Sequence, residues 1–189
     1  MVYLIAGLIA FLGVHTLTTL RGPRAALIGR LGEGPYKGLY SLVSAVGLVL
    51  IVWGFGQYRG TGWVQIWSPP AALRPLTYLL MWFAFVALAA TYCPPGRIKS
   101  ALRHPMLVAV KAWALAHLLA NGALGALLLF GAFLAWAVYD RVAVKRRGEL
   151  GAPKVARFAS GDMISIAVGT VACVVMFWVH PWLFGVAII

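Results

Sequence analysis

The chain has 189 residues, of which 62% are hydrophobic and only 11% are charged. A soluble domain carries about a quarter charged residues, so this composition excludes one and indicates a membrane protein. The formal net charge of +12 would also suit a nucleic-acid-binding protein. The positive residues, however, fall in short segments between long apolar runs, and a membrane explains that pattern better, so no nucleic-acid partner is expected.

Six apolar runs approach the roughly 20 residues that a helix needs to cross the hydrocarbon core of a bilayer. Short polar segments separate them, and little of the chain remains outside them. The expected spans are about 2–20, 39–56, 73–91, 104–120, 123–139 and 163–180. We therefore predict an all-α fold, a polytopic transmembrane helix bundle that forms a single domain over residues 1–189.

Lys and Arg are distributed unevenly over the segments that connect these spans. Thirteen of the 16 lie in the first, third and fifth connections, two lie in the second, and Lys111 lies within a span. Because positive residues are retained on the cytoplasmic side, the odd-numbered connections are predicted to be cytoplasmic. Both termini should then lie on the non-cytoplasmic side of a bacterial inner membrane.

The first two connections carry signals of their own. The Arg-Gly-Pro sequence at 21–23 should end the first span at the inner interface. Residues 29–38, GRLGEGPYKG, are predicted to form a Gly-rich loop, without the G-x-x-x-x-G-K-[ST] pattern of a phosphate-binding loop. Residues 60–70 are typical of an outer interfacial segment, because Trp63 and Trp67 suit the level of the lipid headgroups.

The later connections are also marked. The third span should close at 94–95, since two consecutive prolines cannot continue a helix. Little more than residues 121–123 joins the fourth and fifth spans, which predicts a tight outer hairpin. The fifth connection, 140–162, is the largest, and its basic cluster is either a determinant of topology or a site for anionic lipid headgroups. The cluster comprises Arg141, Lys145, Arg146 and Arg147.

Acidic residues are absent from the predicted spans. Asp140 and Asp162 fall at cytoplasmic ends, and Glu33 and Glu149 lie in connections. Carboxylate proton relays and di-metal carboxylate sites need acids at depth, and a Ser-His-Asp triad needs an acid beside its histidine. The sequence therefore argues against these kinds of chemistry within the membrane.

Four histidines remain as candidate functional residues. His15 lies about one and a half turns before the end of the first span, and His104 opens the fourth span near the headgroups. His117 follows 13 residues after His104, and at about 100° per residue the two point to different faces of one helix. They cannot bind one metal from that helix. His180 is expected to be a solvated residue at the outer interface.

Two interpretations are open for His15 and His117, because ionisable groups inside a membrane are functional candidates by default. Each is either a neutral imidazole that is hydrogen-bonded between helices or a ligand of haem iron, since paired axial histidines are typical of membrane b-type cytochromes. Spaced four residues apart, Trp113, His117 and Asn121 form a stripe that should face the interior of the bundle.

Three other side chains also admit alternatives. Lys111 either extends its ammonium group back to the cytoplasmic headgroups or provides the counter-ion for an anionic ligand such as a haem propionate. Cys93, directly before proline, is either inert or a thiolate ligand of haem. Cys93 and Cys173 lie at different depths, so a disulfide between them is not expected.

Three stretches of the chain resemble the NnrU family of bacterial membrane proteins: HTLTTLR at 15–21, RHPMLVAVKAWALAHLLANG at 103–122 and LFGAFLAWAVYD at 129–140. The resemblance covers nearly the whole chain, and the family is associated with nitric oxide reduction and denitrification. The family also looks distantly similar to the plant zeta-carotene isomerase, a membrane protein that uses haem b. In that protein, H-S-G-L-A-x-L-R, R-H-P and A-H-T segments occur in the same order.

This resemblance implies a haem b site with histidine ligation. We expect His15 and His117 to be the metal ligands, since His104 is closer to water. The expected residues of the cofactor site are His15, His104, Lys111, Trp113 and Asn121. Residues 16–18 are Thr-Leu-Thr where the isomerase has Ser-Gly-Leu, so its carotenoid specificity does not carry over.

Functions of three classes follow. The first is a haem-dependent isomerase or oxidoreductase of nitrogen-oxide metabolism, whose partner is a hydrophobic small molecule or a membrane redox protein. The second is a membrane methyltransferase, because the R-H-P start of the fourth span also resembles the isoprenylcysteine methyltransferase type, which binds S-adenosylmethionine. The third is a non-enzymatic assembly or regulatory protein of a larger oxidoreductase.

Overall fold

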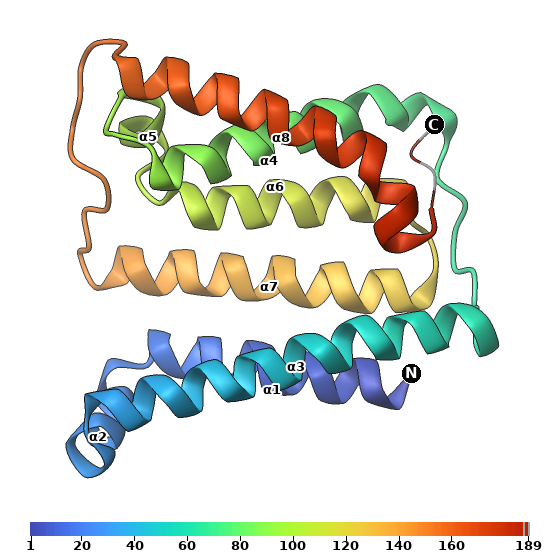
Figure 1. Ribbon diagram of the computed structural model, residues 1–189, viewed down its shortest axis with the longest axis horizontal. Helices are drawn as coiled ribbons and strands as arrows, with labels where there is room; N and C mark the ends of the chain where they lie inside the picture. The colour runs from blue at the N-terminus through green and yellow to red at the C-terminus, as the bar shows by residue number, and fades with distance from the viewer. Residues whose placement is uncertain (187, 189) are drawn as a thin grey trace. The chain divides into compact units, whose positions relative to one another are not determined.

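The computed structural model describes residues 1–186 and 188 (Figure 1). In this part of the chain the regular structure is helical, apart from one isolated antiparallel bridge between Gln65 and Ala123. The prediction of an all-α fold is therefore confirmed. The chain divides into two compact units, Met1–Pro69 with Asn121–Arg146 and Pro70–Ala120 with Arg147–Ile189.

Four helices build the first unit. They are α1 (Val2–Thr19), α2 (Arg21–Leu31), α3 (Glu33–Thr61) and α7 (Leu124–Arg146). Helix α1 packs along α3 and also contacts α7. Glycines bring the backbones of α1 and α3 together, since a Cβ on Gly7 would lie 2.6 Å from the Ile51 nitrogen and a Cβ on Gly47 would lie 2.7 Å from the Phe11 nitrogen. Small residues permit this close approach because they have little or no side chain. Close packing matters within lipid, where apolar burial gives helices little net attraction.

The prediction of a loop at 29–38 is wrong. Helix α2 continues to Leu31 and α3 begins at Glu33, so only Gly32 interrupts the helical path. Gly32 has φ of 83°, a conformation that other residues rarely adopt. Pro35 lies in the first turn of α3, where backbone N–H groups have no partner within the helix, so the N–H that proline lacks is not missed by the helix hydrogen bonds. Glycine and proline here mark a sharp junction between two helices and not a long loop.

Residues 62–70, most of the segment predicted to lie at the outer interface, follow the end of α3 outside any helix, and their place at an interface stays a prediction. Tyr58 is buried, and its hydroxyl accepts the Val64 N–H at 3.0 Å and donates to the Val64 carbonyl at 3.1 Å. The Ile66 N–H donates to the Gly122 carbonyl and the Leu124 N–H donates to the Val64 carbonyl, each at 2.8 Å. These bonds join the segment to the start of α7 within the first unit.

The second unit contains the remaining helices. They are η1 (Ala71–Leu73), α4 (Arg74–Tyr92), α5 (Arg97–Leu102), α6 (Pro105–Ala120) and α8 (Ser160–Phe184). Helix α4 packs against both α6 and α8. A Cβ on Gly169 of α8 would lie 2.6 Å from the Val86 Cα of α4, so these two helices also meet at a glycine. Helix α4 ends directly before the two prolines, as the sequence predicts.

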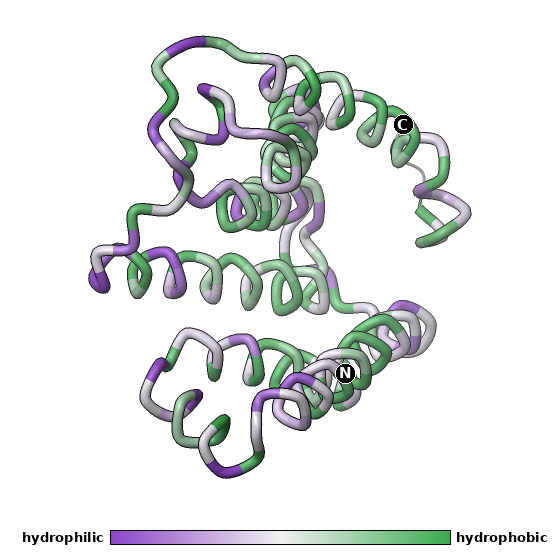
Figure 2. Tube along the Cα trace, turned by 60° about the vertical axis from the view of Figure 1, so that its left-hand side comes forward, coloured by the Kyte–Doolittle hydropathy of each residue, from purple (hydrophilic) through white to green (hydrophobic). Residues whose placement is uncertain are grey.

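Five of the described helices are long and apolar enough to cross a membrane: α1, α3, α4 with η1, α7 and α8. The expected fourth span forms α6, which has 16 residues and is about 24 Å long, against about 30 Å of hydrocarbon. The count of six spans and the side of the termini stay predictions. Figure 2 shows hydrophobic residues along the long helices and hydrophilic residues gathered in the connections.

The fifth connection is shorter than predicted. Helix α7 continues to Arg146 and α8 begins at Ser160, so only residues 147–159 lie outside both helices. The expected boundary at 140 is not a helix end, because Arg141, Lys145 and Arg146 of the basic cluster lie in the last turns of α7 and only Arg147 follows it. Cations are favourable there, near the negative end of the helix dipole.

Candidate functional site

His15 lies on α1 within an aromatic cluster of the first unit. Its ring stacks on Phe11 with 4.2 Å between ring centroids. Tyr40 from α3 and Trp136 from α7 lie 5.4 and 5.7 Å from the His15 ring, and Trp136 meets it edge-on. The Trp136 Nε1 is buried and has no hydrogen-bond partner among the described residues. Aromatic rings from three helices therefore surround one imidazole.

The hydrogen bond of His15 decides its tautomer. His15 Nδ1 lies 2.6 Å from the Phe11 carbonyl oxygen, one turn earlier on the same helix. A carbonyl oxygen only accepts hydrogen bonds, so Nδ1 must carry a proton. In the neutral imidazole the lone pair then resides on Nε2. This is the arrangement of a metal-ligating histidine whose other ring nitrogen donates to the backbone.

The end of α1 beyond His15 is tied to α7. The Thr18 hydroxyl donates to the His15 carbonyl at 2.6 Å, and the Thr19 hydroxyl donates to an Asp140 carboxylate oxygen at 2.7 Å. The sequence placed Asp140 only at a helix end and did not predict this partner. Its hydrogen bond holds the last turn of α1 against α7, one turn beyond His15, and so supports the position of the imidazole.

His117 has the same local arrangement on α6 in the second unit. Its Nδ1 lies 2.8 Å from the Trp113 carbonyl oxygen, so Nδ1 carries the proton and the lone pair of the neutral ring is on Nε2. The Trp113 ring lies 5.1 Å from the His117 ring. Trp113 also lines an apolar pocket of about 270 Å³ between α4 and α6, together with Met81, Phe85 and Val110.

His104 differs from these two histidines. It precedes α6, as predicted, and its Nε2 lies 3.3 Å from the Glu149 carbonyl oxygen. The proton is therefore on Nε2, and this nitrogen is engaged with the backbone. The Arg103 carbonyl accepts the Ala152 N–H at 2.7 Å, so both residues join the start of α6 to the segment before α8. Gly151 fits there because a Cβ would meet the His104 ring and the Arg103 carbonyl.

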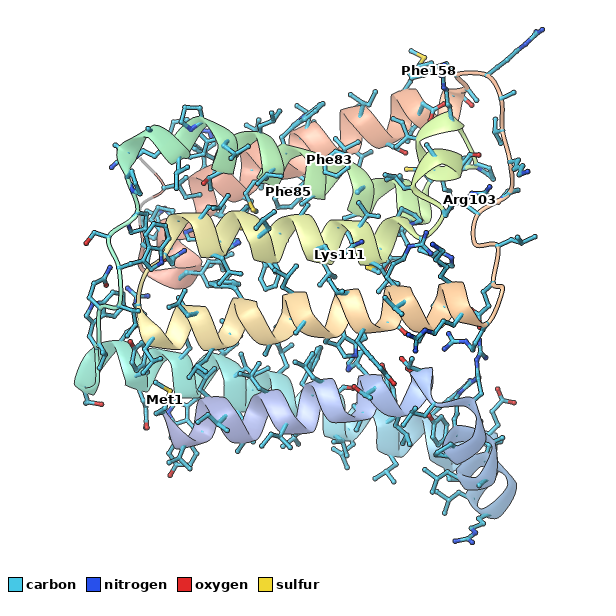
Figure 3. The ribbon with its side chains drawn as sticks, turned by 180° about the vertical axis from the view of Figure 1, so that it is seen from behind. Met1, Phe83, Phe85, Arg103, Lys111 and Phe158 are labelled. Carbon is cyan, nitrogen blue, oxygen red and sulfur yellow. The ribbon has the colours of Figure 1, made fainter. Side chains whose placement is uncertain are left out.

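The other predicted site residues are distributed as follows. Lys111 is half-buried in the middle of α6, and Arg103 lies at the entry to this helix (Figure 3). Asn121 directly follows the last residue of α6, so Trp113 and His117 lie within the helix and Asn121 lies at its end. Asn121 and His15 belong to the first unit, whereas His104, Lys111, Trp113 and His117 belong to the second. The pairing of His15 with His117 stays a prediction.

Cys93 takes part in the end of α4 through its backbone. The Lys99 ammonium donates to the carbonyls of Thr91 and Cys93, each at 2.9 Å, and thus satisfies the last turn of α4. Both cysteines are free thiols. Within the described residues, His, Cys, Asp and Glu form no group of three or more that could hold a metal ion. A haem needs only one or two protein ligands, so this finding does not bear on it.

Among the described residues Asp162 is a fully buried acid, which the sequence placed only at a helix end. Its side chain is 0% exposed. One carboxylate oxygen accepts the backbone N–H groups of Arg97 at 2.9 Å and Ala159 at 2.8 Å, and the other accepts that of Ile98 at 2.7 Å. Asp162 thus caps α5 and α8 together. The bond from the Ala159 N–H is one half of a capping box, whereas Ala159 has no side-chain acceptor for the other half, so the sequence lacks the full signal.

Comparison with known proteins identifies the family. A family model described as NnrU protein matches residues 3–188. No curated protein and no solved structure matches the chain. The similarity to zeta-carotene isomerase therefore stays a prediction from the histidine motifs. The match covers nearly all of a chain with several apolar helices, which fits a multi-pass membrane protein connected with nitric oxide reduction and denitrification. The chain belongs to the NnrU family.

Proposed function

We propose that this protein binds haem b in the membrane, where the Nε2 atoms of His15 and His117 would hold the iron. The observation that carries the proposal is the shared hydrogen bond from Nδ1 to the carbonyl four residues earlier, at 2.6 Å for His15 and 2.8 Å for His117. Each bond orients the ring and leaves the Nε2 lone pair as the donor to iron. The Nε2 of His104 is engaged with Glu149, which supports its exclusion from the pair.

The surroundings of the two rings also suit a haem. Macrocycles of this kind are apolar and planar, and His15 is enclosed by the rings of Phe11, Tyr40 and Trp136. The buried Trp136 Nε1 has no acceptor among the described residues, and a carboxylate of a bound group would supply one. Lys111 would provide a positive charge for a second carboxylate. Bound haem would supply an iron centre for electron transfer or for isomerisation of an apolar substrate.

Optical spectroscopy tests this proposal. The protein is purified in detergent from haem-replete cells, and the oxidised and reduced spectra are recorded with a pyridine haemochromogen assay of haem content. We expect a Soret band and sharp reduced α and β bands. His15→Ala and His117→Ala should each abolish or shift these bands, whereas His104→Ala, the matched control, should keep them. Imidazole added to His15→Gly and His117→Gly should restore the spectrum by replacing the missing ligand.

The outcomes separate the possible errors. A colourless and folded wild-type protein would overturn the haem proposal altogether. Loss of haem in His104→Ala with normal spectra in His117→Ala would keep the haem and reassign a ligand.

We propose in addition that this haem serves nitric oxide metabolism, which rests on family membership. In membranes of a denitrifying bacterium that lacks the protein, wild-type chain should restore nitric oxide consumption and His15→Ala should not. Full restoration by His15→Ala would contradict this role.

A further inference from the structure

A small apolar pocket lies at the basic end of the first unit, where α1, α2 and α3 meet. Its volume is about 100 Å³, and its wall includes Leu17 of α1, Leu27 and Leu31 of α2, and Tyr36 and Val43 of α3. This is about two thirds of the volume of a cavity that accommodates benzene. The pocket can therefore take a short length of hydrocarbon chain, and α2 forms one of its sides.

Two hydrogen-bond donors next to this pocket have no acceptor within the part of the chain that the structure describes. Tyr36 is only 6% exposed, and its buried hydroxyl has no hydrogen-bond partner among the described residues. The same holds for the buried Nε of Arg24. Arg24 lies three residues before Leu27 and seven before Leu31, so it shares with them the face of α2 that borders the pocket. Buried donors are nearly always satisfied, which indicates that a group absent from the chain itself supplies the acceptor.

The charge around the pocket indicates the nature of that group. Between residues 21 and 37 the chain has four cations and a single acid. The acid, Glu33, forms an ion pair with Lys37 at 2.8 Å, and both side chains are well exposed. Guanidinium groups bind phosphate through paired N–H donors, and basic clusters beside membrane helices attract anionic headgroups.

We propose that the pocket binds one anionic phospholipid, with part of an acyl chain between Leu17, Leu27 and Val43 and its phosphate held by Arg24 and Tyr36. The acyl chain alone gives little preference for this pocket over the bilayer, because a lipid tail is as well solvated by the bilayer as by leucine side chains. Selectivity for this lipid over a zwitterionic one therefore comes from the Arg24 guanidinium and the Tyr36 hydroxyl. This site is independent of the proposed haem.

Binding of short-chain phosphatidylglycerol to the full-length protein in neutral detergent tests the proposal, with native mass spectrometry as the readout. Phosphatidylcholine with the same chains and inorganic phosphate are the comparison ligands. We expect saturable binding of one phosphatidylglycerol, with at least tenfold weaker binding of the other two. Tyr36→Phe should weaken phosphatidylglycerol binding by about tenfold, as expected for the loss of one hydrogen bond to a charged group.

Matched variants distinguish specific binding by Arg24 from general electrostatic attraction of the lipid to the basic residues of α2. Arg24→Lys keeps the charge but removes the Nε–H, so it should weaken binding by several-fold. Arg30→Gln removes one charge from an exposed position of the same helix and should change binding by less than about twofold. Equal effects of Arg24→Gln and Arg30→Gln would overturn the site, as would equal binding of phosphatidylcholine or of inorganic phosphate. Unchanged circular dichroism in each variant verifies that α2 is folded.

Haem content is measured on the same preparations. Tyr40 lines the pocket and its ring lies 5.4 Å from that of His15, so the two sites are neighbours in the first unit. We expect Tyr36→Phe to keep its haem and His15→Ala to keep its lipid. Lipid binding that disappears in His15→Ala, with the fold retained, would contradict an independent lipid site, whereas a colourless protein that binds lipid would contradict the haem proposal alone.

Discussion

The clearest test of the structure is Asp162→Asn, which removes a buried charge without a change of shape. The carboxylate accepts three backbone N–H groups, and no part of the residue is exposed to solvent. An asparagine has only one acceptor oxygen. Its NH₂ group replaces the second carboxylate oxygen and must therefore face at least one backbone N–H that bonds to that oxygen in the wild-type protein. With the amide oxygen toward Arg97 and Ala159, the Ile98 N–H has no acceptor.

The magnitude follows from this count of hydrogen bonds. An unsatisfied buried donor costs about 1–3 kcal/mol, and each remaining bond loses the extra strength of a charged acceptor, about 1 kcal/mol. The substitution should therefore destabilise the second unit by about 3–5 kcal/mol, since the amide cannot move away. A Cβ on Gly96 would lie 2.5 Å from the carboxylate, which shows how closely the backbone surrounds it.

Thermal unfolding in detergent measures this effect, and a chain of this length should lose about 10 °C in its midpoint. Hydrogen exchange should increase at the first turns of α5 and α8. The matched control is Glu33→Gln, the same chemical change at an exposed ion pair, which should leave the midpoint unchanged because such pairs contribute little. A midpoint for Asp162→Asn equal to that of Glu33→Gln would refute the double cap.

Two further predictions concern the first unit. Gly47→Ala should destabilise the packing of α1 on α3 by about 1–3 kcal/mol, because its Cβ would lie 2.7 Å from the Phe11 nitrogen. The control Gly56→Ala, whose Cβ would have nothing within 4 Å, should be neutral or stabilising. Thermal midpoints compare the two variants, and equal losses would contradict the close contact. Tyr58→Phe should cost about 1–3 kcal/mol by removing both hydrogen bonds to Val64, and unchanged hydrogen exchange at residues 62–66 would argue against them.

Local patterns were sufficient for much of the fold. Hydropathy located the apolar helices, and Pro94 and Pro105 correctly predicted where α4 ends and where α6 begins. The same local reasoning fails at 29–38, where Gly and Pro predict a loop and the structure has two helices joined at Gly32. The apolar faces of α2 and α3 pack around one pocket there, and this packing outweighs the low helix propensity of glycine.

The candidate site was predictable as a set of residue types but not as an arrangement. Motifs identified His15, His104 and His117, but they did not show which ring nitrogen each histidine has available. The carbonyl that each ring contacts decides this, and His104 finds its carbonyl at Glu149, 45 residues along the chain.

The sequence by itself determined that this is an all-α protein with several apolar helices, and it located the ends of α1, α4 and α6, because hydropathy and proline act over a few neighbouring residues. Only the tertiary structure decided that Asp162 is a buried double cap and that the Tyr36 hydroxyl has no acceptor among the described residues. Burial and hydrogen-bond satisfaction depend on residues far apart in the chain, such as Asp162 and Arg97, 65 positions away, and no local pattern encodes them.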